Sequence, residues 1–482
     1  VTLSLNEIQI YYYMVLNLIS KEDIEKIHLA TINILYKVGV KFNDEEALRV
    51  FDENGAEVDY KGKIVKINES LIKEAIMKCP KTIKLYSRNQ RNFFEVGNGK
   101  TYTHTPEGAH LVEDLETGVV RPALLEDMEN FIKLINNLDN INVYAPIVDP
   151  QDIPLKVRDL YRSKISLENL EKHFIICSHS YEGMVHSVKM ASIIVGGIDE
   201  LVKRPIVTGD GGAVSPLTSS NHNLKILKYC ASIGLPCSIG SMPQAGATAP
   251  ASLAGTIVLQ NAENLSWITL AQLIKPKLPV ISLTRASIMD LRNGRLAAGA
   301  PEAVIMSAIL TQLYKHYEIP VDSGWCVSDS ILLDVQVGYD KMPMMLISIL
   351  SNADFISGFG LIGSGSIASY LQLVIDDEAF SIVSRIARGV EINDESLALD
   401  IIGKVGPEGS FLGEKHTIKT IKMGEYFFPK VFSRIGKEGE SITCRARRKV
   451  MELLSKSQPE PLPIDVRKEL NTYFNEALKQ VT

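Results

Sequence analysis

Between about residue 122 and residue 390 the chain alternates short apolar runs with segments of helical periodicity, and this alternation limits the possible folds most strongly. Such a pattern is typical of parallel β-sheets whose strands are connected by helices. About eight strand–helix units occur, which favours closure into a (β/α)8 barrel. The apolar runs are 141–148, 174–177, 205–207, 236–239, 279–283, 319–321, 354–357 and 368–374. The predicted helices are 124–138, 157–171, 182–194, 219–233, 250–273, 301–317, 335–351 and 377–388.

An open, doubly wound sheet is the main alternative for such a pattern. That fold often carries a Gly-x-Gly-x-x-Gly sequence after its first strand, and none is found there. We therefore predict an α/β protein with a TIM barrel at residues 122–390. Residues 1–121 would form an N-terminal mixed α/β appendage, with helices at 20–38, 44–54 and 69–79. Residues 391–482 would form a C-terminal helical extension packed on the barrel.

The composition excludes several classes of function. A formal net charge of −6 gives no overall basic field for binding nucleic acid. The six cysteines form no Cys-x-x-Cys pair, which indicates free thiols in a reducing cytoplasm. No apolar run reaches the ~20 residues of a membrane helix, and the apolar residues 1–19 lack the basic start of a signal peptide. We expect a cytoplasmic enzyme without membrane or nucleic-acid partners, which forms a homo-oligomer through its outer helices.

Functional side chains of such barrels gather at the carboxyl ends of the strands. Trp325, one of two tryptophans, follows the sixth apolar run; it is either a packing residue or a pocket wall that attracts a cation. His179 is a candidate base or a structural histidine, and Arg285 could simply pair with Asp290 or Asp322. The other residues at predicted strand ends are Asp149, Ser178, Asp210, Met242, Gln244, Thr284, Gly358, Phe359, Gly360, Tyr370 and Gln372.

The sequence shows no strong pattern of metal ligands. A zinc-dependent barrel methyltransferase needs a cluster of thiolate and imidazole ligands, because the metal must activate a thiol or alcohol substrate. The sequence Cys177-x-His179 comes nearest to such a cluster, and Cys237 and Cys326 are the other cysteines near strand ends. We therefore expect no metal in this chain.

Several motifs together resemble those of the trimethylamine methyltransferase superfamily. The longest is Gly240-Ser-Met-Pro-Gln-Ala-Gly-Ala-Thr-Ala-Pro-Ala-Ser-Leu-Ala-Gly-Thr256, and Gln260-Asn-Ala-Glu263 follows it. The resemblance covers nearly the whole chain and is specific only when the motifs are combined. The other motifs are Asp114-Leu-Glu-Thr-Gly118, Asp290-Leu-Arg-Asn-Gly294, Ala300-Pro-Glu302, Asp334-Val-Gln-Val-Gly-Tyr-Asp-Lys341, Leu373-Val-Ile-Asp-Asp-Glu378 and Phe411-Leu-Gly-Glu-Lys-His-Thr417.

The resemblance implies a (β/α)8 methyltransferase that moves a methyl group from a methylated amine to the cobalt of a corrinoid (cobalamin) carried by a separate, cognate corrinoid protein. It also implies a role in one-carbon metabolism, including methanogenesis. Founding members carry pyrrolysine at the end of strand six, where this chain has Cys326 or Val327. Members without pyrrolysine resemble glycine betaine methyltransferase and use quaternary amines. A glycine betaine-like quaternary amine is therefore the expected substrate.

The chemistry and the resemblance together nominate site residues. An aromatic cage for the ammonium would consist of Trp325, Tyr339, Phe359 and Tyr370. Arg285 would hold a substrate carboxylate, and Asp322, Glu107 and His104 would make polar contacts to the substrate. Of these, Trp325, Asp322 and Glu107 are the candidate catalytic residues. Gln244 and Met242 would line the mouth where the corrinoid approaches.

Two other functions remain open at this point. One is a zinc-dependent corrinoid methyltransferase of the same fold, for which stoichiometric zinc would be the sign. The other is a non-catalytic protein that binds methylated amines but never methylates cobalamin.

Overall fold

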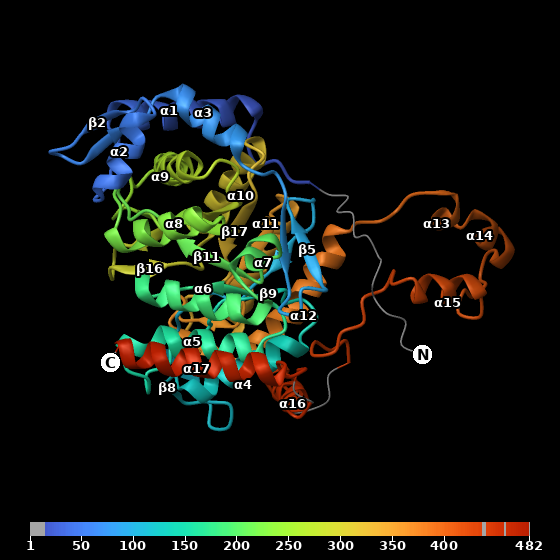
Figure 1. Ribbon diagram of the computed structural model, residues 1–482. Helices are drawn as coiled ribbons and strands as arrows, with labels where there is room; N and C mark the ends of the chain where they lie inside the picture. The colour runs from blue at the N-terminus through green and yellow to red at the C-terminus, as the bar shows by residue number, and fades with distance from the viewer. Residues whose placement is uncertain (1–14, 436–439, 457–458, 482) are drawn as a thin grey trace.

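The computed structural model describes residues 15–435, 440–456 and 459–481, and a parallel β-barrel surrounded by helices forms its centre (Figure 1). Residues 1–14, which make up most of the segment considered as a signal peptide, lie outside these ranges. In the described part of the chain the barrel sheet has eight strands, so the predicted α/β TIM-barrel fold is confirmed. They are β6 (Tyr102–Thr103), β9 (Val143–Tyr144), β10 (His173–Ile176), β11 (Val207–Gly211), β12 (Cys237–Ser241), β14 (Val280–Thr284), β17 (Val321–Trp325) and β18 (Phe355–Ser357).

The barrel closes between its first two strands in the sequence, β6 and β9. All neighbouring strands pair in parallel, in the order β6-β18-β17-β14-β12-β11-β10-β9. A parallel bridge between His104 and Val143 connects the two ends of this order. The Asn142 N–H donates to the Thr103 carbonyl at 3.0 Å across the same seam. The carboxyl ends of all eight strands therefore meet at one face.

One predicted strand was wrong. The apolar run 368–374 is not part of the barrel: β20 (Ile367–Ser369) pairs with β19 (Leu361–Ile362) and β7 (Leu111–Glu113) in another sheet, and Tyr370 begins a helix. The first turns of that helix are buried on every side, so their sequence lacks helical periodicity and imitates a strand. The missing strand is β6, which lies before the predicted barrel boundary at residue 122 and is too short to show a pattern.

A helix follows each barrel strand and covers the outside of the sheet. The predicted helices agree within about three residues, except that the last begins at Tyr370 rather than at residue 377. These helices are α4 (Leu125–Asn137), α5 (Leu155–Asn169), α6 (Tyr181–Val195), α8 (Asn221–Ile233), α9 (Leu253–Ile274), α10 (Pro301–His316), α11 (Val335–Leu350) and α12 (Tyr370–Ala387). The short helix α7 (Ile198–Lys203) follows α6.

The N-terminal layer packs on helix α9 and buries it almost completely (Figure 1). Buried polar residues of α9 then bond to the ends of the neighbouring barrel strands. Gln260 Nε2 donates to the Ser241 carbonyl at 2.6 Å, and Asn264 Nδ2 donates to the Leu283 carbonyl at 2.9 Å. Buried amides are stable only when they are bonded in this way. The N-terminal layer thus stabilises the helix that fixes the carboxyl ends of β12 and β14.

The N-terminal layer contains both helices and strands. Ser20 caps its first helix, since the Asp23 N–H donates to Ser20 Oγ at 3.1 Å. Its elements are α1 (Lys21–Lys37), β1 (Val40–Lys41), α2 (Glu45–Glu53), β2 (Glu57–Asp59), β3 (Ile64–Lys66), α3 (Glu69–Lys78), β4 (Ile83–Tyr86) and β5 (Phe93–Val96). Loop strands beyond it are β8 (Val120–Pro122), β13 (Gln244–Ala245), β15 (Ser287–Asp290) and β16 (Arg295–Ala297).

The C-terminal segment has two parts with different packing. Helix α16 (Ile442–Leu454) packs on α12 and α4, and α17 (Ile464–Val481) packs on α5 and α6. The short helices α13 (Asp394–Leu397), α14 (Leu399–Val405) and α15 (Lys415–Lys422) project from the body and contain no buried residue (Figure 1). None of the helices in the described ranges combines the length and apolar character needed to cross a bilayer.

Candidate active site

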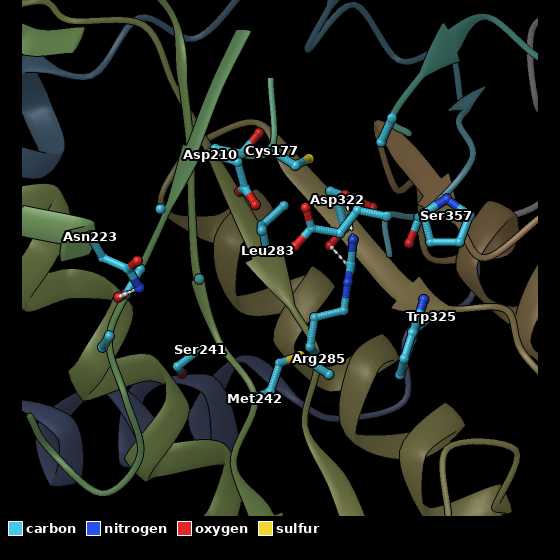
Figure 2. Close-up of a pocket in the computed structure, with 18 of the residues that line it drawn as sticks. Cys177, Asp210, Asn223, Ser241, Met242, Leu283, Arg285, Asp322, Trp325 and Ser357 are labelled. Carbon is cyan, nitrogen blue, oxygen red and sulfur yellow. Dashed lines mark hydrogen bonds and ion pairs between the residues drawn. The ribbon is translucent and has the colours of Figure 1, made fainter. Parts of the chain in front are cut away.

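A cavity of about 520 Å³ lies at the carboxyl ends of the barrel strands (Figure 2). Its walls come from the ends of β10, β11, β12, β14, β17 and β18 and from the segment after β6. This is the position at which barrel enzymes place their chemistry. The lining of the cavity contains two clusters of ionisable side chains and one tryptophan, Trp325.

The first cluster centres on Asp322, the second residue of β17. Its Oδ2 lies 2.8 Å from His104 Nε2 and 2.5 Å from Arg285 Nη2 (Figure 2). The other ring nitrogen of His104 lies 2.8 Å from the Thr105 carbonyl, so both ring nitrogens face acceptors. Burial alone would raise the pKa of Asp322, but Arg285 and His104 more than offset that effect and hold it below its usual range. Asp322 is therefore a buried carboxylate with its charge retained.

The second cluster consists of Glu107, Cys177 and Asp210. One potential ligand atom from each of the three lies within 4.8 Å of the others. Burial, and then the charge of Glu107, raises the pKa of Asp210 to about 7. Burial, followed by Glu107 and Asp210, raises the pKa of the Cys177 thiol well above its usual value. The cluster therefore holds negative charge with difficulty, and a bound cation, metal or organic, would relieve it.

Trp325 faces the cavity because of a bulge at the end of β17. The pairing of β17 with β18 shifts register between Ser323 and Trp325, and Gly324 between them has a φ of +67°. A bulge of this kind changes the direction in which the next side chain points. The ring packs so closely on Gly365 that a Cβ there would lie 2.4 Å from it. Trp325 is thus held as a fixed wall of the cavity.

The structure brings together most of the residues nominated from the sequence. Seven of them line the cavity: His104, Glu107, Met242, Gln244, Arg285, Asp322 and Trp325. Arg285 does so in the alternative role considered above, as the ion-pair partner of Asp322.

Three nominated cage residues do not line the cavity. Tyr339 is 74% exposed on the outer helix α11, and Phe359 is fully buried beside Phe380. Tyr370 is buried, stacks on Phe131 and donates its hydroxyl to Asp127 Oδ1 at 2.8 Å. The prediction for Tyr370 failed because the residue begins helix α12 instead of ending a barrel strand. Of the four residues predicted to form an aromatic cage, Trp325 is the one that lines the cavity.

The two residues at the expected pyrrolysine position do not line the cavity. Both Cys326 and Val327 are buried. The Cys326 thiol instead faces the Lys341 carbonyl at 3.2 Å. Of these neighbouring residues, Trp325 is the one whose side chain reaches the cavity.

Asp210, Cys177 and Asn223 line the cavity, although no sequence pattern marks them as site residues. Asp210 and Cys177 were visible at predicted strand ends, yet no spacing rule connected them with Glu107, which follows the unpredicted strand β6. Asn223 comes from the first turn of α8 and donates its Nδ2 to the Gly212 carbonyl at 2.8 Å. His179, by contrast, lies outside the lining and bonds to Asp149, as expected of a structural histidine.

Comparisons with known proteins agree with this fold. The family model "Trimethylamine methyltransferase (MTTB)" matches residues 6–481. The chain is 32% identical over 472 residues to the glycine betaine methyltransferase of Desulfitobacterium hafniense (strain Y51), covering 96% of this chain and 98% of the relative. It is 30% identical over 464 residues to a trimethylamine methyltransferase MttB of D. hafniense (strain DSM 10664 / DCB-2), covering 95% and 93% of the two chains.

A solved structure shows the same fold at low sequence identity. The monomethylamine methyltransferase of Methanosarcina barkeri superposes with a TM-score of 0.54 and 12% identity, covering 98% of this chain and 89% of that one. Because the family model and the relatives each match nearly the whole chain, this protein belongs to the trimethylamine methyltransferase family.

Proposed function

We propose that this methyltransferase moves a methyl group from a quaternary amine to the Co(I) of a corrinoid carried by a separate protein. The observation that supports the proposal best is the acidic cluster of Glu107 and Asp210, which has no ion-pair partner in the described part of the chain and lines the same cavity as Trp325. Among the described residues, no Lys, Arg or His nitrogen lies within 4.0 Å of a carboxylate oxygen of Glu107 or Asp210. Such a site favours a ligand that carries a permanent positive charge.

A quaternary amine suits the chemistry of this cavity. As the methyl group leaves, the electron pair of the carbon–nitrogen bond stays on nitrogen, and the nitrogen becomes a neutral amine. The corrinoid would supply the electron pair that forms the new bond to carbon. This chain then has to hold the ammonium in line and to exclude water. Trp325 can contribute about 0.5–2 kcal/mol to cation binding through its ring face.

The edge of the cavity offers residues that could face the corrinoid. Met242 is 45% exposed in the lining, and Gln244, also in the lining, begins β13 two residues later. An exposed apolar residue next to a polar amide fits contact with a large, partly apolar macrocycle. We propose that these two residues contact the corrinoid or its carrier protein.

The decisive experiment mixes the protein with cob(I)alamin and a panel of quaternary and tertiary amines, and follows the Co(I) absorbance. We expect loss of the Co(I) band with at least one quaternary amine and none with trimethylamine. A relative of established activity serves as the positive control. If no donor consumes Co(I) while the control does, the proposal is wrong for these donors. Ligand binding without turnover would then favour a non-catalytic amine-binding protein.

A zinc-dependent methyltransferase is the second candidate, and the Glu107–Cys177–Asp210 cluster favours it. Carboxylate and thiolate are ordinary zinc ligands, and three protein ligands leave the open position of a catalytic site. Because the pKa of the Cys177 thiol is raised, the side chain stays protonated without a metal. Bound zinc would favour its deprotonation to the thiolate. Metal analysis of the purified protein decides: one zinc per chain, lost in Cys177→Ser, supports this candidate, and less than a tenth of an equivalent excludes it.

A further inference from the structure

The cavity lining has an unequal balance of charge. It contains the carboxylates of Glu107, Asp210 and Asp322. Against them, Arg285 is the one lysine or arginine that the described chain contributes to the lining. When Asp210 is ionised, three carboxylates face two positive groups even with His104 counted as a cation. The field in the cavity therefore attracts cations and repels anions.

The charge of Arg285 is already committed within the protein. Its Nη2 lies 2.5 Å from Asp322 Oδ2, and its Nη1 donates to the carbonyls of Asp322 at 3.1 Å and of Thr284 at 3.2 Å. Figure 2 shows the side chain extended toward Asp322. A substrate carboxylate that approached Arg285 would meet a neutralised pair instead of a free cation. It would also have to displace a buried carboxylate or lie beside it.

Asp322 itself has a free acceptor. The residue is 2% exposed, and its Oδ1 has no hydrogen-bond partner. A buried carboxylate oxygen without a partner costs free energy, which a cationic or hydroxyl-bearing ligand in the adjoining cavity would offset. A ligand carboxylate would add repulsion to the same atom. The unpartnered Oδ1 of Asp322 therefore favours a positively charged ligand, as the Glu107–Asp210 pair does.

We infer that the methyl donor is a quaternary ammonium without a carboxylate, such as a tetraalkylammonium or a choline-like amino alcohol. The inference rests on the proposed function and narrows its substrate class. Polar but uncharged groups in the lining suit a hydroxyl: they are Ser178, Ser215, Asn223, Ser238, Ser241 and Thr248. In this arrangement Asp322 is a specificity-determining residue, because it neutralises the one arginine that a betaine would need.

The test compares three probes of similar size: tetramethylammonium, choline and glycine betaine. Calorimetry on the full chain gives each dissociation constant, at low ionic strength and with EDTA so that no metal neutralises the carboxylates. We expect the two cations to bind at least tenfold more tightly than glycine betaine. Equal affinities, or tighter binding of glycine betaine, would overturn the inference.

The carboxylates can be tested separately in variants Glu107→Gln and Asp210→Asn. Each should reduce the preference for choline over glycine betaine by about fivefold or more. Asp52→Asn is the matched control: it makes the same chemical change on the outer surface of α2, where Asp52 accepts a bond from Tyr60. An unchanged preference in both cavity variants would show that these carboxylates do not select the ligand, and would also count against the inference.

Turnover distinguishes failure of this inference from failure of the proposed function. Consumption of Co(I) with glycine betaine but not with choline or tetramethylammonium would refute the inference and leave the quaternary amine methyltransferase intact. If none of the three probes binds and no quaternary amine of the full panel consumes Co(I), the proposed function and the inference fail together.

Discussion

Two acidic residues at the carboxyl-terminal face of this barrel have opposite electrostatic surroundings. Asp149, which follows β9, is surrounded by cations: Arg158 Nη1 lies 2.5 Å from its Oδ2, and His179 Nε2 lies 3.1 Å from its Oδ1. Arg162 Nη1 lies 3.6 Å from the same Oδ1. Asp210, which ends β11, faces Glu107 and Cys177 instead. The Asp149 carboxylate is thus neutralised by side chains of the protein. The Asp210 carboxylate faces other acidic groups and could instead be neutralised by a bound cation.

The contrast also appears in the proton affinities. The pKa of Asp149 is lowered, because His179 and Arg162 outweigh the effect of burial. The pKa of Asp210 is raised to about 7 by burial and by Glu107. The same residue type, at the same edge of one sheet, is thus stabilising in one place and destabilising in the other. Functional sites typically differ from structural ones in this way.

Disrupting the ion pairs of Asp149 should have the largest effect on stability. Asp149→Ala leaves the buried guanidinium of Arg162 and that of Arg158 without their shared carboxylate. Loss of one partner of a buried ion pair costs about 3–5 kcal/mol, so the free energy of unfolding should fall by that amount. Urea denaturation followed by circular dichroism measures it. A loss below about 1 kcal/mol would mean that the cluster is not structural.

Removing the charge of Asp210 should have the opposite effect and stabilise the protein. Asp210→Asn is expected to raise the free energy of unfolding by about 1–2 kcal/mol at pH 8. The raised pKa means that the folded protein holds the proton more tightly than the unfolded chain does. The wild-type protein therefore loses stability as the pH rises from 3.8 to about 7, and the variant does not. Denaturation at pH 4.5 and pH 8 should show the gain at the higher pH only; Asp52→Asn serves as the control for the amide substitution.

The fold followed from the sequence because hydrophobic periodicity is a local signal. Seven of the eight barrel strands overlap predicted apolar runs, and the helices that follow the barrel strands lie where helical segments were predicted, except for the start of α12. Strand β6 was missed because it has two residues and its neighbours Thr101 and Thr105 are polar. The run 368–374 was misassigned because Leu371 and Val374 are both buried in a helix that has no solvent-facing side there.

The site could be predicted from the sequence only in part. The rule that functional residues lie at the carboxyl ends of barrel strands gives the edge of the sheet but not the direction of each side chain. It placed Asp322, Arg285 and Trp325 at the cavity correctly. It could not show that Arg285 is neutralised by Asp322, since that depends on a contact across two strands. It also could not connect Glu107 with Asp210, because that contact requires the closure of β6 onto the barrel.

A smaller effect is expected at the aromatic wall. Trp325→Leu removes the ring face but keeps an apolar side chain, so affinity for tetramethylammonium should fall by about two- to thirtyfold, which corresponds to about 0.5–2 kcal/mol. Stability should change little, since the ring is only partly buried. Calorimetric titration measures the affinity. A variant that binds as tightly as the wild-type protein would assign cation recognition to the carboxylates alone.

The smallest effect should come from Tyr339, the residue that sequence reasoning placed in the cage and the structure places on the surface. Its side chain is 74% exposed on α11, so Tyr339→Ala removes neither core packing nor a cavity wall. We expect affinity for tetramethylammonium within a factor of two of the wild-type value and a change in unfolding free energy within about 0.5 kcal/mol. The same titration and denaturation experiments measure both. A tenfold loss of affinity would mean that the ligand reaches α11, and the cation site would then have to extend beyond the Glu107–Asp210 cluster.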